Sequence, residues 1–598
     1  MPTVRPARYR SAVDESRVTG GRRWAPGLAA LTGYDRKWLR GDLVAGVTVT
    51  AYLVPQVMAY AEIAGLPAVT GLWAILAPLL VYAVLGGSRQ LSIGPESTTA
   101  LMTAAGVGAL VATAGAERYA EVAALLAIAV GLVCLAAWLA RLGFLANLFS
   151  HPVLIGYMAG IAVLMIVSQL GKLTGLRISG DTLWDEVASL AGQVSAIHVP
   201  TLVLATICVA AMFAFRRLRP TWPGPLIVIV LAALAVWLGF PGSERVGTVG
   251  AIPTGLPGFA VPQLGDLSVL ALLPAAVGIA VVGYTDNVLT GRAFALKRGE
   301  RIGPTQELLA LGVANVATGL FHGFPVSSSG SRTAVADSVG GRTQLHSLVS
   351  MALVVATLFL LGPLLEAFPT PALGAVIVYA AVRLVDLAEL RRIARFRTSE
   401  LVLALVTTAA VLATGVLAGI GIAIGLSLLD LIRRISRPHD GVLGYVPGLA
   451  GMHDVDDHAG AQLLQGLVVY RYDSPLFFAN AENFRSRALA AVAEVPQPVH
   501  WFVLNAEANI EVDLTAVDAL DELREALAER GITLVLARVK HEIRQQLADA
   551  GFIARVGEDL VFPTLPTAVA GYVEWYRASH GTEPPVLPQA DPGMVQEG

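Results

Sequence analysis

The chain has 598 residues, of which 55% are hydrophobic and 15% are charged, with 42 Lys and Arg against 45 Asp and Glu. Soluble globular proteins carry a charged share of about 25%, so this composition excludes an ordinary soluble enzyme and indicates a membrane protein. The net charge of −3 favours no particular charged partner, and we expect no nucleic-acid partner.

The first part of the chain, residues 1–40, is rich in Arg and lacks an apolar stretch, so we expect a cytoplasmic N-terminal segment without a cleavable signal peptide. Residues 41–437 form a succession of apolar stretches near 20 residues long, such as Val122–Ala140. A helix of about 20 residues crosses a bilayer, which predicts an all-α polytopic domain of about fourteen spans. Both cysteines, Cys134 and Cys208, fall inside spans, so we expect neither a disulfide nor a metal site.

The basic residues predict the orientation of this domain. When about fourteen spans are counted, most Arg and Lys follow even-numbered spans. Because cytoplasmic loops carry an excess of these residues, we expect a multi-pass plasma-membrane protein with both termini in the cytoplasm. The loops assigned to the cytoplasm contain Arg89, Arg141, Arg216, Arg217, Arg219, Lys297, Arg298, Arg301, Arg342, Arg391, Arg392, Arg395 and Arg397. The loops assigned to the outer face contain Arg118, Lys172, Arg177 and Arg245, diluted by acids.

Two segments, Leu91–Thr99 and His322–Thr333, interrupt the apolar pattern with Gly and Pro and continue with small hydroxyl residues. Non-helical backbone at membrane depth is tolerated only where it is buried in protein or lines a cavity. A matched pair of interrupted spans in the two halves of a chain is typical of a transporter built from inverted repeats. We therefore predict that two half-helices begin here and that the substrate site lies between them.

The residues at these half-helix starts favour an anion as the substrate. Each start would present free N–H groups and about half a positive charge. Hydroxyl groups can donate hydrogen bonds to an oxyanion. Arg332 would add a full positive charge and the planar set of N–H donors of its guanidinium group. The alternative for the hydroxyl groups is helix capping and close helix packing. The predicted substrate-binding residues of these segments are Glu96, Ser97, Thr98, Ser328, Ser329, Ser331 and Arg332.

Two acids within the apolar region, Asp286 and Glu96, suggest coupling to a proton. A carboxylate that repels an anion when ionised and accepts it when protonated makes the binding of proton and anion mutually favourable, which is symport. The alternative for Asp286 is a structural pair with Arg332 or a capping role, and Glu96 would be favourable at a helix start without any function. The coupling ion is thus expected to be a proton, with sodium as the alternative.

Motifs of enzymes and ATP-driven pumps are absent from the sequence. There is no GxxxxGK[ST] phosphate loop, no HExxH motif and no cluster of Cys and His. We therefore expect no enzymatic activity, no metal and no cofactor.

Seven stretches carry a family resemblance: Asp42–Gly46, Val54–Tyr60, Pro67–Trp73 with Gly86–Arg89, Gly94-Pro95, Thr305–Leu308, Gly323–Pro325 and Ser331–Thr333. Together they resemble the sulfate permease family, also called solute-carrier family 26, most of all its actinobacterial members labelled sulfate transporters. The likeness covers nearly the whole chain after Gly41. Thr70 and Trp73 stand where the family's signature usually has Tyr, and Asp286 stands where many members have Glu.

The resemblance implies about fourteen spans in two inverted repeats of about seven, each contributing to a core and a gate that move against each other in alternating access. It implies that Gln56 on the first span and Asp286 on the eighth line the site together with the two half-helix starts. Members often form homodimers, and their substrates include sulfate, bicarbonate, chloride and dicarboxylates.

The last part of the chain has the composition of a soluble domain. Residues 438–464 are polar and are expected to form a linker. In residues 465–577, buried strands alternate with amphipathic helices, which predicts a small α/β domain that resembles the STAS domain. Thr515 stands where soluble STAS proteins have a phosphorylated residue, but with Asp518 it also fits a helix cap. Residues 578–598 are expected to be disordered.

The favoured interpretation is a secondary active transporter for sulfate or a related inorganic anion, coupled to protons. Bicarbonate or dicarboxylate transport, anion exchange and an anion channel are alternatives within the same family. From a different class, the chain could be a membrane-anchored regulator that acts through its STAS domain.

Overall fold

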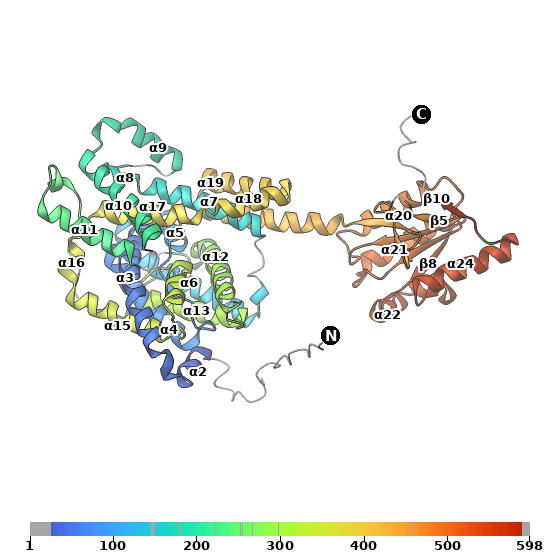
Figure 1. Cartoon of the computed structure of the whole chain (residues 1–598), viewed down its shortest axis with the longest axis horizontal. Helices are drawn as coiled ribbons and strands as arrows, with labels where there is room; N and C mark the ends of the chain where they lie inside the picture. The colour runs from blue at the N-terminus through green and yellow to red at the C-terminus, as the bar shows by residue number, and fades with distance from the viewer. Residues whose placement is uncertain are drawn as a thin grey trace, which may run out of the picture. The chain divides into compact units, whose positions relative to one another are not determined.

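The computed structural model describes residues 25–144, 150–178, 180, 182–219, 222–250, 253, 255–265, 267–296, 298–458 and 460–588. Internal contacts divide the chain into two units, Met1–Ser427 and Leu428–Gly598, which are described separately here (Figure 1). Residues 1–24 of the expected N-terminal segment and residues 589–598 of the expected disordered tail lie outside the described residues.

The first unit is helical, with a single pair of two-residue strands among its described residues. Its helices are α2 (Pro26–Thr32), α3 (Leu39–Ile63), α4 (Ala68–Leu85), α5 (Ser97–Ala114), α6 (Tyr119–Leu139), α7 (His151–Ser168), α8 (Leu170–Thr174), α9 (Leu183–Gly192), α10 (Val199–Leu218), α11 (Gly224–Leu238), α12 (Val269–Leu296), α13 (Pro304–Leu320), α14 (Gly330–Ser338), α15 (Leu345–Leu360), α16 (Gly362–Glu366), α17 (Thr370–Leu384), α18 (Leu387–Phe396) and α19 (Thr398–Ser436). The α19 helix is kinked at Gly415, where φ is 80°.

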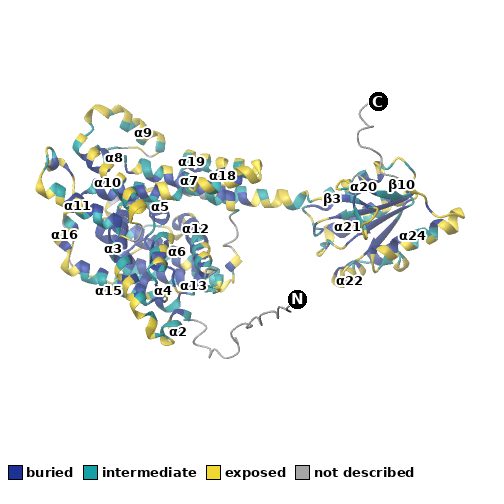
Figure 2. Ribbon diagram, viewed as in Figure 1, coloured by how far each residue is buried: buried dark blue, intermediate teal, exposed yellow. Residues whose placement is uncertain are grey.

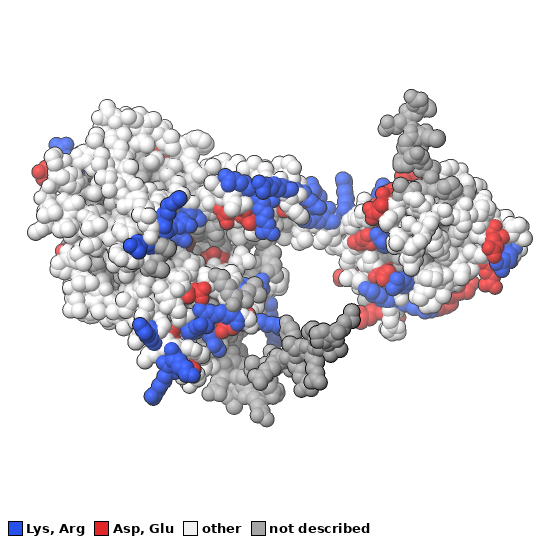
Figure 3. Space-filling view, in the orientation of Figure 1, with Lys and Arg blue, Asp and Glu red and all other residues white. Residues whose placement is uncertain are grey.

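Seven helical stretches of the described residues are long and apolar enough to cross a bilayer, judged by length and composition. They are Arg36–Ile63, Ala68–Leu85, Tyr119–Leu139, His151–Thr174, Val199–Leu218, Val269–Ala295 and Thr398–Val416. Three shorter apolar helices, α5, α11 and α15, accompany them. Figure 3 shows large uncharged areas on the visible face of this unit, with Lys and Arg confined to a few places. The first unit therefore has the composition and surface of a membrane domain.

Small residues bring helices of this unit into backbone contact. On α6 and α13, a Cβ added at Gly131 would lie 2.6 Å from the carbonyl oxygen of Gly312. A Cβ at Gly319 would lie 2.5 Å from the carbonyl oxygen of Ala124. Membrane helices gain no hydrophobic driving force from lipid, so close packing through small residues is how they associate. Figure 2 shows the buried residues concentrated at the centre of the unit, around α3.

The two interrupted segments meet inside this packing. Residues Ile93–Gly94 form β1 and residues Ser327–Ser328 form β2, and the two strands pair antiparallel, with Ile93 opposite Ser328. Helix α5 begins shortly after β1, and α14 begins shortly after β2. Backbone N–H and C=O groups inside a membrane need hydrogen-bond partners. The pairing of β1 with β2 supplies partners for such groups in both interrupted segments. It also fixes the starts of two half-helices beside each other, as the sequence predicts.

The second unit is an α/β domain built on a mixed sheet of order β10-β5-β3-β6-β7-β8-β9, with β4 paired to β3. Its strands are β3 (Asp440–Tyr445), β4 (Met452–Asp454), β5 (Gln462–Leu464), β6 (Leu467–Tyr472), β7 (Trp501–Asn505), β8 (Thr533–Ala537), β9 (Val561–Phe562) and β10 (Val586–Pro588). Strands β6 to β9 are parallel. The helices are α20 (Ala481–Ala493), α21 (Leu514–Ala528), α22 (His541–Asp549), α23 (Phe552–Val556) and α24 (Leu565–His580).

Both faces of this sheet are covered. Phe502 and Leu504 of β7 pack with α20 and α21 in one apolar cluster, whereas Trp501 and Val503 pack with α24 in another. Alternate residues of β7 thus point to opposite faces of the sheet. Because both faces are covered by helices, every residue from Trp501 to Leu504 is apolar.

The prediction of a linker over residues 438–464 is wrong. These residues contain β3, β4 and β5, and β3 pairs antiparallel with β6, with Val442 opposite Tyr470. The start of the expected tail is also ordered, because α24 reaches His580 and β10 pairs with β5. The sheet therefore extends beyond both expected limits of the domain.

The start of α21 also differs from the prediction. Its N-cap is Asp513, whose carboxylate accepts hydrogen bonds from the backbone N–H groups of Ala516 and Phe478, each at 2.8 Å. Thr515 lies inside the first turn and is exposed, so the predicted capping role belongs to Asp513.

This correction predicts unequal effects of two substitutions. Asp513→Ala should destabilise α21 by about 1 kcal/mol or more, because it removes an N-cap and leaves a second N–H without its acceptor. Thr515→Ala should change stability by no more than about 0.5 kcal/mol, as is usual for an exposed site. Hydrogen exchange of the α21 amides in the full chain would measure both. Equal protection in the two variants would contradict the assignment of the cap.

Candidate functional site

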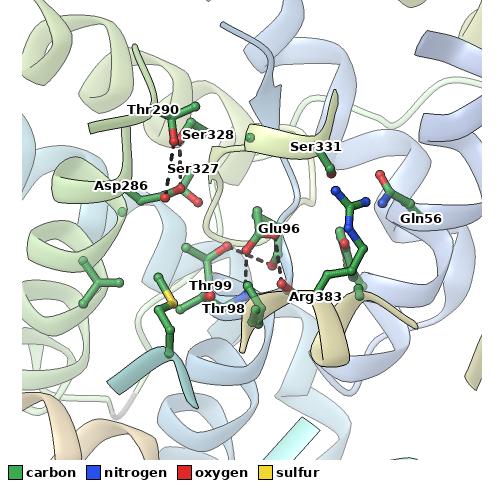
Figure 4. Close-up of a pocket in the computed structure, with 18 of the residues that line it drawn as sticks. Gln56, Glu96, Thr98, Thr99, Asp286, Thr290, Ser327, Ser328, Ser331 and Arg383 are labelled. Atoms are coloured by element: carbon green, nitrogen blue, oxygen red, sulfur yellow. Dashed lines mark hydrogen bonds between the residues drawn. The ribbon is translucent and has the colours of Figure 1, made fainter. Parts of the chain in front are cut away.

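A cavity of about 210 Å³ lies where the two half-helices begin. It is lined by residues of α3, α5, α12 and α17 and by the segment from β2 to α14 (Figure 4). Its wall is closely packed, because a Cβ at Gly283 of α12 would lie only 3.3 Å from the Cβ of Ser327. The cavity is thus bordered by the interrupted backbone and by packed helices, with Met158 of α7 also on its wall, as expected for a transporter site.

On the α5 side, Glu96 caps its own half-helix. Its carboxylate accepts hydrogen bonds from the backbone N–H of Thr98 and from the hydroxyl of Ser97, each at 2.8 Å. Ser97 is 1% exposed and Thr98 is 5% exposed, yet both line the cavity. A negative side chain therefore already occupies the positive end of α5, which limits what this end can offer to an anion.

On the α12 side, Asp286 reaches toward the second half-helix. One carboxylate oxygen accepts a hydrogen bond from the Ser328 hydroxyl at 2.9 Å, and the other accepts one from Thr290 at 3.5 Å. Figure 4 shows these three side chains together at one end of the cavity. A proton on Asp286 would therefore change both the charge of the cavity and the hydrogen bonding of Ser328.

The other end of the cavity contains a cation that the sequence analysis missed. Arg383, in the last turn of α17, lines the cavity and donates a hydrogen bond to the Tyr52 hydroxyl at 3.3 Å. Gln56 and Ser331 lie at the same end in Figure 4. Gln56 is 2% exposed, and its side-chain oxygen has no hydrogen-bond partner among the described residues. Together these groups form a polar end with a full positive charge.

Arg332 does not line the cavity. It is fully buried, and its guanidinium donates to the carbonyl oxygen of Pro95 at 2.9 Å and to the Ser92 hydroxyl at 3.3 Å. It therefore ties the second half-helix to the segment that precedes the first. One terminal nitrogen, Nη2, has no hydrogen-bond partner among the described residues, and it lies 3.4 Å from the place of a Cβ on Gly94. A structural role is thus visible, and direct contact of Arg332 with an anion stays a prediction.

The structure brings most of the predicted site residues together. The predicted residues that line the cavity are Gln56, Glu96, Ser97, Thr98, Asp286, Ser328 and Ser331. Ser329 is buried and caps α14 by accepting a hydrogen bond from the backbone N–H of Arg332. Arg383 was missed because an Arg at the end of an apolar stretch has the same sequence signal as a basic loop residue.

A buried carboxylate outside the cavity has a structural role. Glu307 of α13 accepts hydrogen bonds from the Tyr82 hydroxyl at 2.8 Å, the Asn287 amide at 2.8 Å and the backbone N–H of Gly87 at 3.0 Å. These contacts join α13 to α4 and α12. Glu307 is fully buried and accepts three hydrogen bonds, so its role is to hold packed helices together.

A second cavity, of about 250 Å³, shares Tyr52, Ser331 and Arg383 with the first. It continues past α14 and α11 toward Arg216, in the last turn of α10, at a helix end assigned to the cytoplasm. The three shared residues thus stand between the site and a second, mainly apolar space on that side.

The charges of the site depend on protonation. With both acids ionised, Glu96 and Asp286 offset the positive charges of Arg383 and of the nearby Arg332. Each proton that binds to one of the acids raises the local charge by one. Binding of an anion and binding of a proton are therefore mutually favourable in this arrangement.

Comparison with known proteins agrees with this geometry. A model of the Sulfate permease family matches residues 39–407, and a model of the STAS domain matches residues 459–568. A probable sulfate transporter of Mycobacterium tuberculosis (strain ATCC 25618 / H37Rv) is 56% identical over 549 residues, covering 92% of this chain and 98% of the relative. Sulfate transporter 4.1, chloroplastic, of Arabidopsis thaliana is 29% identical over 562 residues, covering 91% of this chain and 82% of the relative.

A solved structure shows the same fold. Murine Solute Carrier 26 family member A9, an anion transporter in the inward-facing state, aligns with a TM-score of 0.84 at 23% identity. The alignment covers 94% of this chain and 96% of that chain. A helical membrane domain followed by an α/β STAS domain, as predicted from the sequence, is confirmed.

Proposed function

The chain belongs to the sulfate permease family and ends in a STAS domain, and from this premise we propose that it carries sulfate across the plasma membrane. We infer the substrate from two relatives that are named as sulfate transporters. Each of them matches more than nine-tenths of this chain. Because these relatives are named as transporters, we propose that this chain has no enzymatic activity.

One observation carries the proposal of a coupled anion carrier. The cavity between the half-helices combines a cation, Arg383, with hydroxyl donors and two acids, Glu96 and Asp286. With the nearby Arg332 counted, the charges of the site balance when both acids are ionised, and each proton taken up adds one positive charge, so the site suits a proton-coupled oxyanion. The hydroxyls of Ser331 and Thr98 supply donors to the oxygens of the anion.

The orientation follows from the basic loops, with both termini and the STAS domain in the cytoplasm. The second cavity, next to Arg216, then lies on the cytoplasmic side and gives the site an inner route. We propose that movement of a core carrying both half-helices against a gate that includes α17 exposes the site alternately. A homodimer and a regulatory role of Thr515 remain predictions.

Labelled sulfate uptake into proteoliposomes tests the function. We expect uptake that an inward proton gradient stimulates by several-fold, because each pH unit is worth about 1.4 kcal/mol per coupled proton. Empty liposomes and an outward gradient serve as controls. Absence of sulfate uptake, with uptake of bicarbonate or a dicarboxylate instead, would contradict the substrate and leave the family standing.

The same preparation separates the remaining alternatives. A channel would pass anion current without saturation and without a response to the gradient. An exchanger would need an anion on the opposite side. A membrane-anchored regulator would transport nothing, although the intact pair of half-helices argues against that function.

A further inference from the structure

A cavity of about 640 Å³ opens at the far end of α17 from the candidate site. Thr370 and Pro371, the first residues of α17, line it, whereas Arg383 in the last turn lines the site. Thirteen residues of helix separate Thr370 from Arg383, which corresponds to about 20 Å. The cavity is therefore separate from the site between the half-helices.

Three basic residues line this cavity: Lys172 at the end of α8, Arg177 in the following loop, and Arg245. They are three of the four cations that the topology assigns to the outer face. Segments far apart in the sequence thus gather most of the outer positive charge around one space. One described acid, Glu186, lines the cavity with them.

The three basic residues differ in whether they form an ion pair. The ammonium group of Lys172 lies 2.6 Å from the carboxylate of Glu62, which belongs to α3. Arg177 and Arg245 are exposed, and the ion pairs of the described residues include neither of them. The positive charge of the two Arg side chains is therefore available to an anion in the cavity. Thr201 and Ser168 add hydroxyl groups to the wall.

We propose that this cavity is an outer collecting site, which binds the transported oxyanion loosely and raises its concentration at the outer face. The proposal rests on the proposed function for its orientation and for the identity of the anion. Concave surfaces lined by one sign of charge raise local ligand concentration and association rates, and salt reduces the effect. An anion here also competes with Glu62 for Lys172, so occupancy weakens the ion pair between α3 and α8.

Cysteine labelling measures the potential in the cavity without requiring transport. Leu176 lines the cavity and provides the labelling position, and the native residues Cys134 and Cys208 are buried. A Leu176→Cys variant in proteoliposomes is treated from outside with a negatively charged or a positively charged methanethiosulfonate reagent. Relative to a small free thiol, we expect the negative reagent to react about tenfold faster than the positive one at low salt. External sulfate should slow both reactions.

Substitutions in the Leu176→Cys background test which residues set this ratio. Arg177→Gln combined with Arg245→Gln should lower the ratio by about threefold or more. Arg118→Gln is the matched control, because Arg118 lies on the same face but is paired with Glu121 at 3.0 Å. The control should leave the ratio unchanged.

Transport kinetics give a second readout. The double substitution should raise the KM for external sulfate by about threefold at low ionic strength, less at high ionic strength, and leave kcat unchanged. Equal labelling by both reagents, or a ratio that the double substitution does not change, would overturn the collecting site. Because labelling needs no transport, failure of sulfate uptake with a preserved labelling ratio would refute the proposed substrate and support the cavity.

Discussion

Sulfate uptake by an Asp286→Asn variant should no longer respond to an inward proton gradient. Asp286 lines the cavity and accepts a hydrogen bond from Ser328. Asn keeps the size of the side chain and one of the two oxygens that accept from Ser328 and Thr290, but it cannot take up a proton. In the parent, a proton on Asp286 adds one positive charge and favours the anion, so uptake should rise as the pH on the side of uptake falls. In the variant, we expect the several-fold stimulation to fall to about onefold.

Initial rates of labelled uptake with and without a gradient of about one pH unit provide the measurement. Glu96→Gln is the informative companion, because Glu96 already caps α5 through Thr98 and Ser97. Gln keeps one acceptor oxygen for the cap, so uptake should fall only modestly while the response to the gradient persists. Asp430→Asn, which alters an exposed pair with Arg434, controls for loss of an acid elsewhere. A gradient response that survives in Asp286→Asn would exclude this residue as the coupling group.

The site was largely predictable because its sequence signal is unusual. Gly and Pro followed by Ser and Thr in the middle of apolar stretches conflict with a continuous helix, and such backbone must be buried or line a cavity. The pairing of β1 with β2 explains how both interruptions are accommodated at one place. Asp286 was predictable for a similar reason, since an isolated acid in a membrane span is costly unless it has a function.

The roles of Arg332 and Arg383 were harder to predict, because the sequence does not show in which direction a charged side chain points. Arg332 was expected to face the anion, but its guanidinium turns to Ser92 and Pro95, which belong to the other interrupted segment. That contact joins residues about 240 apart in sequence, so no local pattern indicates it. Arg383 ends an apolar helix, where an Arg usually marks the cytoplasmic boundary, and only the fold shows that it reaches the cavity.

In the second unit, the error concerned the strands β3, β4 and β5, on one side of the sheet. The segment 438–464 contains three short strands separated by glycines, two of which, Gly448 and Gly451, have positive φ. Short strands with few apolar residues resemble a polar linker, because most of their stabilisation comes from pairing with other strands. The central strands β6, β7 and β8 were predictable because each is apolar along its length.

An Arg383→Gln variant should bind sulfate much more weakly than the parent. Arg383 lines the cavity on the side of Gln56 and Ser331, and its guanidinium donates a hydrogen bond to the neutral hydroxyl of Tyr52. A hydrogen bond to a charged group contributes about 1.5–3 kcal/mol, so its loss corresponds to an increase in the KM for sulfate of about tenfold to a hundredfold. Concentration dependence of labelled uptake would measure it.

Arg383→Lys should recover only part of this loss, because an ammonium restores the charge but not the planar fork that matches an oxyanion. Arg392→Gln is the control, since Arg392 lies on α18, is exposed and pairs with Glu389 at 3.1 Å. Its KM should equal that of the parent. An unchanged KM in Arg383→Gln would move the anion away from α17 and toward the half-helix starts, where the hydroxyl donors, the start of α14 and the field of the buried Arg332 would attract it. A large effect of Arg383→Gln with partial rescue by Lys would instead make α17 the helix that supplies the positive charge of the site.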